Sequence, residues 1–101
     1  MSEEKTFLVI NATANKDNME DLKTYLGSIT PVIGKNGAKP VGRYRATDQL
    51  VGDNGPEMVA VFEFPSSEAI KAMIESDDYK ALSELRKKAF TKLNLTICGE
   101  M

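Results

Sequence analysis

The chain has 101 residues, of which 42% are hydrophobic and 28% are charged, as expected for one soluble globular domain spanning residues 1–101. Thirteen basic and fifteen acidic residues give a net charge of −2, which argues against a nucleic-acid-binding protein. The absence of histidine excludes histidine-dependent catalysis and histidine-ligated zinc, and we expect neither a metal nor a cofactor.

The first half of the chain predicts a strand, a helix and a second strand. Residues 5–14 (KTFLVINATA) are rich in the β-branched and aromatic side chains that favour strands. Apolar residues then recur at helical spacing as far as GKNG at 34–37, and Pro31 is expected to kink or restart this helix. Residues 38–51 predict the second strand, followed by a turn at 52–57.

The second half predicts a strand, a helical region and a last strand. MVAVFEF at 58–64 is typical of a strand that is buried on both faces. A helix follows over 66–74, SDD at 76–78 breaks and recaps it, and a further helical stretch covers 79–90. KLNLTIC at 92–98 alternates polar and apolar residues, which indicates the last strand.

The order strand, helix, strand, strand, helix, strand predicts the fold class. Two βαβ-like halves of this length, with right-handed crossovers, form a ferredoxin-like α+β sandwich. Its four strands make an antiparallel sheet with the helices on one face. The second strand lies at an edge in this topology, in agreement with Pro40 and its charged residues.

Glu63 is unusual because it is a carboxylate between Phe62 and Phe64 at the end of an apolar strand. The predicted pairing of the second and third strands places Arg45 opposite Glu63 and Tyr44 opposite Phe64. Since side chains alternate along a strand, Glu63 would then lie on the face away from the phenylalanines.

Arg86 is the predicted partner of Glu63. It follows Leu82 by four residues and Tyr79 by seven, so it lies on the apolar stripe of the last helix. A guanidinium group on an inward stripe needs an acceptor, just as a carboxylate on a central strand needs a donor. Arg45 and Tyr79 are further candidates for contact with Glu63.

Each of these features also has a structural interpretation. An inward arginine–glutamate pair is more often an anchor than a catalytic site, although such pairs seldom add net stability. Tyr25, Tyr44 and Tyr79 are more often packing residues than acids or bases. Cys98 is more often a half-buried hydrophobic residue than a nucleophile.

The expected cellular location rests on three features of the sequence. The longest apolar run, MVAVF at 58–62, is far shorter than the roughly 20 residues of a membrane-spanning helix, so we expect no membrane association. The start MSEEKTFLVI does not resemble a secretory signal. A single cysteine excludes an intrachain disulfide and fits the cytoplasm.

The segment EFPSSEAIKAMIESDDYKALSELR at 63–86 resembles the signature of a bacterial family known as domain of unknown function 1330. The signature is Glu-Phe-Pro-Ser, a short helix, Ser-x-x-Tyr, two residues and a Leu, then Leu-Arg. In this chain it comprises Glu63, Phe64, Pro65, Ser66, Ser76, Tyr79, Leu82, Leu85 and Arg86. The N-terminal half is similar through Tyr25 and Gly37. The chain departs from the pattern at Met73 and Ile74, where the family usually has a tryptophan or a similarly large residue, and at KNGAK (35–39), where a double glycine is common.

The resemblance implies a ferredoxin-like subunit that pairs with a second copy into a dimeric α+β barrel. Distant relatives in that superfamily include cofactor-independent monooxygenases, haem-degrading enzymes, lyases, isomerases and ligand-binding regulatory domains. The haem-degrading members depend on a histidine that this chain lacks, so haem is not expected. A shared fold does not transfer a reaction.

Two hypotheses for function remain. In the first, a sheet–helix pocket of a few hundred cubic ångströms binds or converts a small organic molecule, with Glu63 or Arg86 exposed in its wall. Glu63, Arg86 and Tyr79 are its candidate catalytic residues, and Arg45, Tyr25 and Ser76 its candidate ligand-binding residues. In the second, the protein is a non-enzymatic dimeric domain, structural or regulatory, in which an enclosed Glu63–Arg86 pair is only architectural.

Overall fold

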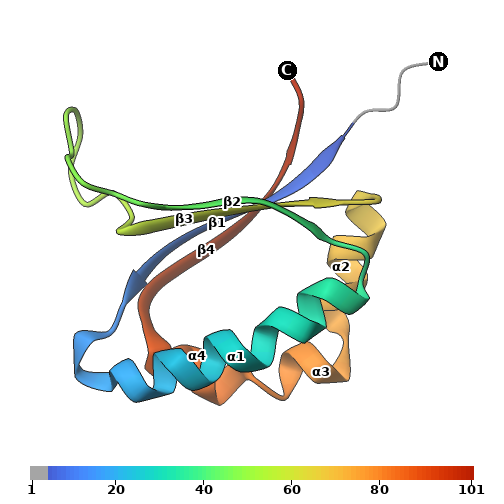
Figure 1. Ribbon diagram of the computed structural model, residues 1–101, viewed down its shortest axis with the longest axis horizontal. Helices are drawn as coiled ribbons and strands as arrows, with labels where there is room; N and C mark the ends of the chain where they lie inside the picture. The colour runs from blue at the N-terminus through green and yellow to red at the C-terminus, as the bar shows by residue number, and fades with distance from the viewer. Residues whose placement is uncertain (1–4) are drawn as a thin grey trace.

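The computed structural model describes residues 5–101 and has the predicted order of elements (Figure 1). In chain order these are β1 (Thr6–Ala14), the 3-10 helix η1 (Lys16–Asn18), α1 (Met19–Lys35), β2 (Lys39–Arg45), β3 (Met58–Phe64), α2 (Ser67–Glu75), α3 (Asp77–Lys80), α4 (Ser83–Ala89) and β4 (Phe90–Gly99). The predicted second helical region is therefore three short helices in succession.

The four strands form one antiparallel sheet in the order β2-β3-β1-β4. All helices lie on one face of this sheet, where α1 and α4 pack side by side, and the other face is left open (Figure 1). This arrangement confirms the ferredoxin-like α+β fold, with β2 at an edge as predicted.

The predicted extent and register of the second strand are wrong. β2 ends at Arg45, which pairs with Met58, and Lys39 is the residue of β2 that lies opposite Glu63. Residues 46–57 form a long loop that projects from the sheet on the side away from the helices (Figure 1). Gly52 and Asn54 adopt positive φ angles of 84° and 57° in this loop, in agreement with the turn predicted over 52–57.

This register reverses the two faces of β2. Tyr44 pairs with Val59 and lies on the open face, whereas Arg43 pairs with Ala60 and faces the helices. A bulge between Pro40 and Gly42 shifts the alternation upstream of these residues. The prediction that Tyr44 shares a face with the phenylalanines is therefore also wrong.

The core lies between the sheet and the helices. Apolar residues of β1 and β3 alternate into it, and α1 contributes its apolar stripe. Its most deeply buried large side chains are Leu8, Ile70 and Met73. Pro31 does not interrupt α1, which is continuous from Met19 to Lys35, because proline removes one hydrogen bond on the exposed side of a helix that is held by its buried stripe.

Two serines begin the short helices. The Ser66 hydroxyl accepts a hydrogen bond from the Ala69 backbone amide at 3.1 Å, and the Ser76 hydroxyl accepts one from Tyr79 at 3.2 Å. The predicted recapping of the chain at Ser76 is thus confirmed. Within residues 5–101, every helix is too short or too polar to span a lipid bilayer.

Candidate functional site

Glu63 and Arg86 do not form the predicted pair, because they lie on opposite sides of the sheet. Phe64 faces the helices and is buried, so its neighbour Glu63 points to the open face, where Phe7 and Lys39 lie opposite it. Arg86 belongs to α4, on the helical side. Glu63 is half-buried at this surface rather than enclosed in the core, which explains why a charge is tolerated there.

Arg86 is instead held by two tyrosines. Its Nε donates to the Tyr25 hydroxyl at 3.1 Å, and one terminal nitrogen donates to the Tyr79 carbonyl oxygen at 2.8 Å. Its guanidinium carbon also lies 3.8 Å from the ring centroid of Tyr79 and 5.5 Å from that of Tyr25. Neutral oxygens and aromatic faces therefore take the place of the expected carboxylate.

We call Tyr25, Tyr79 and Arg86 the arginine–tyrosine cluster. Both tyrosines are buried, with 6% and 9% of their surfaces exposed, and Tyr25 packs edge-on against Phe90 at 5.4 Å between ring centroids. Burial raises the pKa of Tyr79 above its ordinary value of 10, and the charge of Arg86 opposes this shift. Tyr79 is therefore a neutral phenol at pH 7, able to donate a hydrogen bond but not to act as a base.

A narrow cavity of about 90 Å³ lies between α1 and the sheet. Its walls are apolar except where Tyr25, Thr30, Arg43 and Tyr79 contribute to them. The predicted pocket was to be larger and to have Glu63 or Arg86 in its wall, and neither residue lines this cavity. This cavity alone is smaller than predicted, and the expectation that Glu63 or Arg86 lines it is wrong, whereas Tyr25 and Tyr79 do line it.

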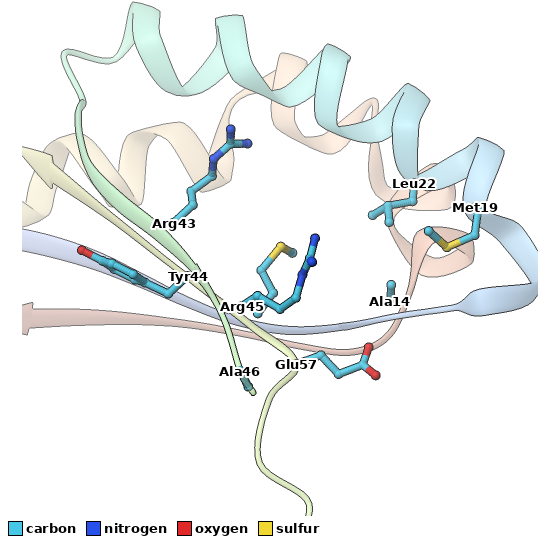
Figure 2. Close-up of a pocket in the computed structure, with 9 residues that line it drawn as sticks. Ala14, Met19, Leu22, Arg43, Tyr44, Arg45, Ala46 and Glu57 are labelled. Carbon is cyan, nitrogen blue, oxygen red and sulfur yellow. The ribbon is translucent and has the colours of Figure 1, made fainter. Parts of the chain in front are cut away.

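Two open hollows adjoin the cavity along the gap between α1 and β2. One, of about 540 Å³, lies toward the start of α1 and is lined by Met19, Arg43, Arg45 and Glu57 among others (Figure 2). The other, of about 410 Å³, lies toward the end of α1. Arg43 lines all three spaces. We call the cavity with its two hollows the α1–β2 groove.

Arg43 and Arg45 both extend from β2 toward α1 (Figure 2). Among the described residues, neither guanidinium group has a carboxylate oxygen within 4.0 Å or a hydrogen-bond partner. Glu57, the acidic residue that lines the same hollow, lies 3.8 Å from the ammonium group of Lys16. Two exposed arginines thus flank an apolar groove with their hydrogen-bonding capacity unused by the described part of the chain.

The sequence prediction identified Arg45 but missed Arg43. The signal was present in GRYRA (42–46), because two arginines separated by one residue must share a face of a strand. The predicted register assigned that face to Glu63, so Arg45 was interpreted as a partner for a carboxylate and Arg43 received no role.

Ser76, a predicted ligand-binding residue, and Tyr44, predicted to pack, lie apart from one another. The Ser76 hydroxyl donates to the Met73 carbonyl oxygen at 2.6 Å while it caps α3, so its hydrogen bonds are already used. Tyr44 lies on the open face and is 56% exposed. Residues 5–101 contain no group of three or more acidic or cysteine side chains placed to hold a metal ion.

The family model described as "Domain of unknown function (DUF1330)" matches residues 5–101. The chain belongs to this family. The match confirms the resemblance seen in the sequence. Comparison with curated proteins gives no match.

Solved structures support the same fold. A protein of unknown function from Rhodopseudomonas palustris is 21% identical, with a TM-score of 0.81 over 99% of this chain and 85% of that chain. A dabb family protein with a ferredoxin-like fold from Mesorhizobium loti is 13% identical, with a TM-score of 0.69 over 98% of this chain and 99% of that chain. A Nitrosomonas europaea protein, described provisionally as an antibiotic biosynthesis monooxygenase, is also 13% identical, with a TM-score of 0.69 over 100% and 94%. At these identities the likeness shows the fold alone.

Proposed function

We propose that the protein binds a small, mainly apolar organic molecule, without a cofactor, in the α1–β2 groove, which includes the cavity between α1 and the sheet. The observation that carries this proposal is the buried Tyr25 side chain, with its hydroxyl group, in the wall of a largely apolar cavity. That hydroxyl accepts a hydrogen bond from Arg86, so its own proton is free to be donated, and no acceptor for it lies among the described residues. Apolar walls with a few fixed polar groups are typical of small-ligand sites.

In this proposal Arg86 positions Tyr25 rather than contacting the ligand. Its contacts with Tyr25 and Tyr79 fix the orientation of both rings. Tyr25 would donate a hydrogen bond to a carbonyl or hydroxyl oxygen of the ligand, and the apolar walls would enclose its hydrocarbon part. Conversion of such a molecule, as the description of the Nitrosomonas europaea protein suggests, would use Tyr25 or Tyr79 as the proton donor.

Titration with acetophenone and with ethylbenzene, followed by amide NMR shifts, tests this proposal. The two molecules have similar size, but only acetophenone has an oxygen that can accept from Tyr25. We expect acetophenone to bind more tightly by about threefold to tenfold in the wild type, from one additional hydrogen bond. The advantage should disappear in Tyr25→Phe and persist in Tyr79→Phe. Absence of saturable shifts at the cavity walls would falsify the proposal.

A second hypothesis is favoured by the contacts of Arg86 themselves. Its two hydrogen bonds, to the Tyr25 hydroxyl and the Tyr79 carbonyl oxygen, join α4 to α1 and α3, as in a purely architectural cluster. The protein would then be a non-enzymatic structural or regulatory domain. Unchanged affinity for both probe molecules in Tyr25→Phe would favour this alternative.

We also infer that the protein forms a homodimer through the open face of its sheet. Phe7, Val9, Val59 and Val61 lie on this face of the two central strands, where Val9 pairs with Val61, and no element of the described chain covers them. A sheet with one uncovered apolar face gains stability when a second layer covers it. Sedimentation equilibrium should therefore show a dimer for the wild type and a monomer for Val61→Lys, and a wild-type monomer would contradict the inference.

A further inference from the structure

We propose that the ligand is a small organic carboxylate, with its hydrocarbon body in the α1–β2 groove and its carboxylate group bound by Arg43 and Arg45. This inference rests on the proposed function, because it names the class of ligand for the same cavity. It involves residues and an interaction that the proposed function does not require.

The position of Arg43 carries the first part of the argument. It is the residue that lines the cavity and both adjoining hollows, so a ligand entering from either hollow passes its side chain. Behind it the cavity walls are formed largely by leucine, isoleucine, methionine and phenylalanine. A cation at the entrance of an apolar space matches a molecule with a charged end and a hydrocarbon end.

The charge balance carries the second part. Arg43 and Arg45 extend in the same direction from alternate positions of β2 (Figure 2). The carboxylate of Glu57, which lines the same hollow, lies within ion-pair distance of Lys16. Two guanidinium groups without a partner among residues 5–101 therefore leave a local excess of positive charge. Guanidinium groups bind carboxylates in a planar, bidentate geometry, which gives them an advantage over lysine at such a site.

The apolar walls distinguish this ligand from other anions. A nucleotide or a sugar phosphate would also pair with arginine, but burial of its polar groups against these walls would cost free energy without compensating hydrogen bonds. A fatty acid or an aromatic acid would bury hydrocarbon there instead. The shared chemistry is a carboxylate on a hydrocarbon body.

Isothermal titration with octanoate and with 1-octanol tests the proposal. The two probes share their hydrocarbon chain and differ in charge. We expect octanoate to bind the wild type at least about tenfold more tightly than 1-octanol, since a charge-assisted hydrogen bond contributes about that factor. Arg43→Gln should remove most of this preference, and Arg45→Gln a smaller part. The preference should weaken as salt concentration rises.

Lys92→Gln is the matched control. It removes the same charge from an exposed residue of β4 that pairs with Thr13 on the open face, and the preference for octanoate should be unchanged in it. An equal loss of the preference for octanoate in Lys92→Gln and Arg43→Gln would indicate a general effect of net charge and would overturn the proposal. If 1-octanol binds and octanoate binds no better, the carboxylate assignment is wrong but the cavity function stands. If neither probe binds, both the carboxylate assignment and the proposed cavity function are wrong.

Discussion

Three arginines on the helical side of the sheet differ in what surrounds them. Arg86 is partly buried and makes two hydrogen bonds, to the Tyr25 hydroxyl and the Tyr79 carbonyl oxygen, besides lying against the Tyr79 ring. Arg43 and Arg45 are exposed at an apolar groove and make no hydrogen bond or ion pair with the described residues. The residue type is the same in both regions, but the fold uses the hydrogen-bond donors of Arg86 and leaves those of Arg43 and Arg45 without a partner among the described residues.

The difference separates a positioning role from a binding role. The guanidinium group of Arg86 is held by two hydrogen bonds and by the Tyr79 ring, so removal of it leaves these partners without their contacts. An exposed guanidinium group costs the fold little and keeps its donors available. We therefore expect substitution of Arg86 to affect stability, and substitution of Arg43 or Arg45 to affect affinity.

Arg86→Met should have the largest effect on the free energy of unfolding. The change removes two charge-assisted hydrogen bonds and a cation–π contact while keeping much of the side-chain volume. We expect a loss of about 2–4 kcal/mol, measured by urea denaturation.

Lys87→Met is the control for that variant. Lys87 is the next residue of α4, is largely exposed and lies 3.6 Å from Glu84 in a surface ion pair. Such pairs contribute about 0–1 kcal/mol, so this substitution should change little. A similar loss in both variants would contradict the distinction between the arginine–tyrosine cluster and the surface.

Tyr25→Phe should have a smaller effect of the same kind. It removes only the hydroxyl that accepts from Arg86 Nε, and we expect a loss of about 1 kcal/mol in urea denaturation. Tyr79→Phe makes the matched comparison. Arg86 contacts Tyr79 through its ring and its carbonyl oxygen, both of which phenylalanine retains. An equal loss in both variants would mean that the effect comes from removing a buried phenol hydroxyl in general, and not from the contact of the Tyr25 hydroxyl with Arg86.

The sequence was sufficient to predict the fold because periodicity and turn residues agreed along the chain. The strand-forming composition of β1 and β3, the alternation in β4, the helical spacing in α1 and the serines that begin helices at Ser66 and Ser76 are all local patterns, and the elements that they predict are present in the structure. Local patterns also placed Arg86 correctly on the inward stripe of its helix.

The candidate site could not be predicted because it depends on which segments meet. Residues 46–51 have strand-like composition but lie in a loop, and this shifted the register of β2 and exchanged the faces of Tyr44 and Arg43. The predicted partner of Arg86, Glu63, was wrong for a related reason. A carboxylate is the commonest partner of arginine, but a tyrosine 61 residues away in the chain supplied the oxygen, and no local pattern indicates that contact.

A double-mutant cycle on Glu63 and Arg86 should give the smallest effect, which makes it the sharpest test of their separation. Because the two residues lie on opposite sides of the sheet, their contributions to stability should add. The coupling free energy from Glu63→Gln, Arg86→Met and the double variant should be below about 0.5 kcal/mol, the usual limit for independent sites. A coupling of several kcal/mol would require the two side chains to meet, which this sheet does not allow unless β3 turns its other face to the helices. That rotation would expose Phe62 and Phe64, so the position of Glu63 follows from the burial of its two neighbours rather than from any partner of its own.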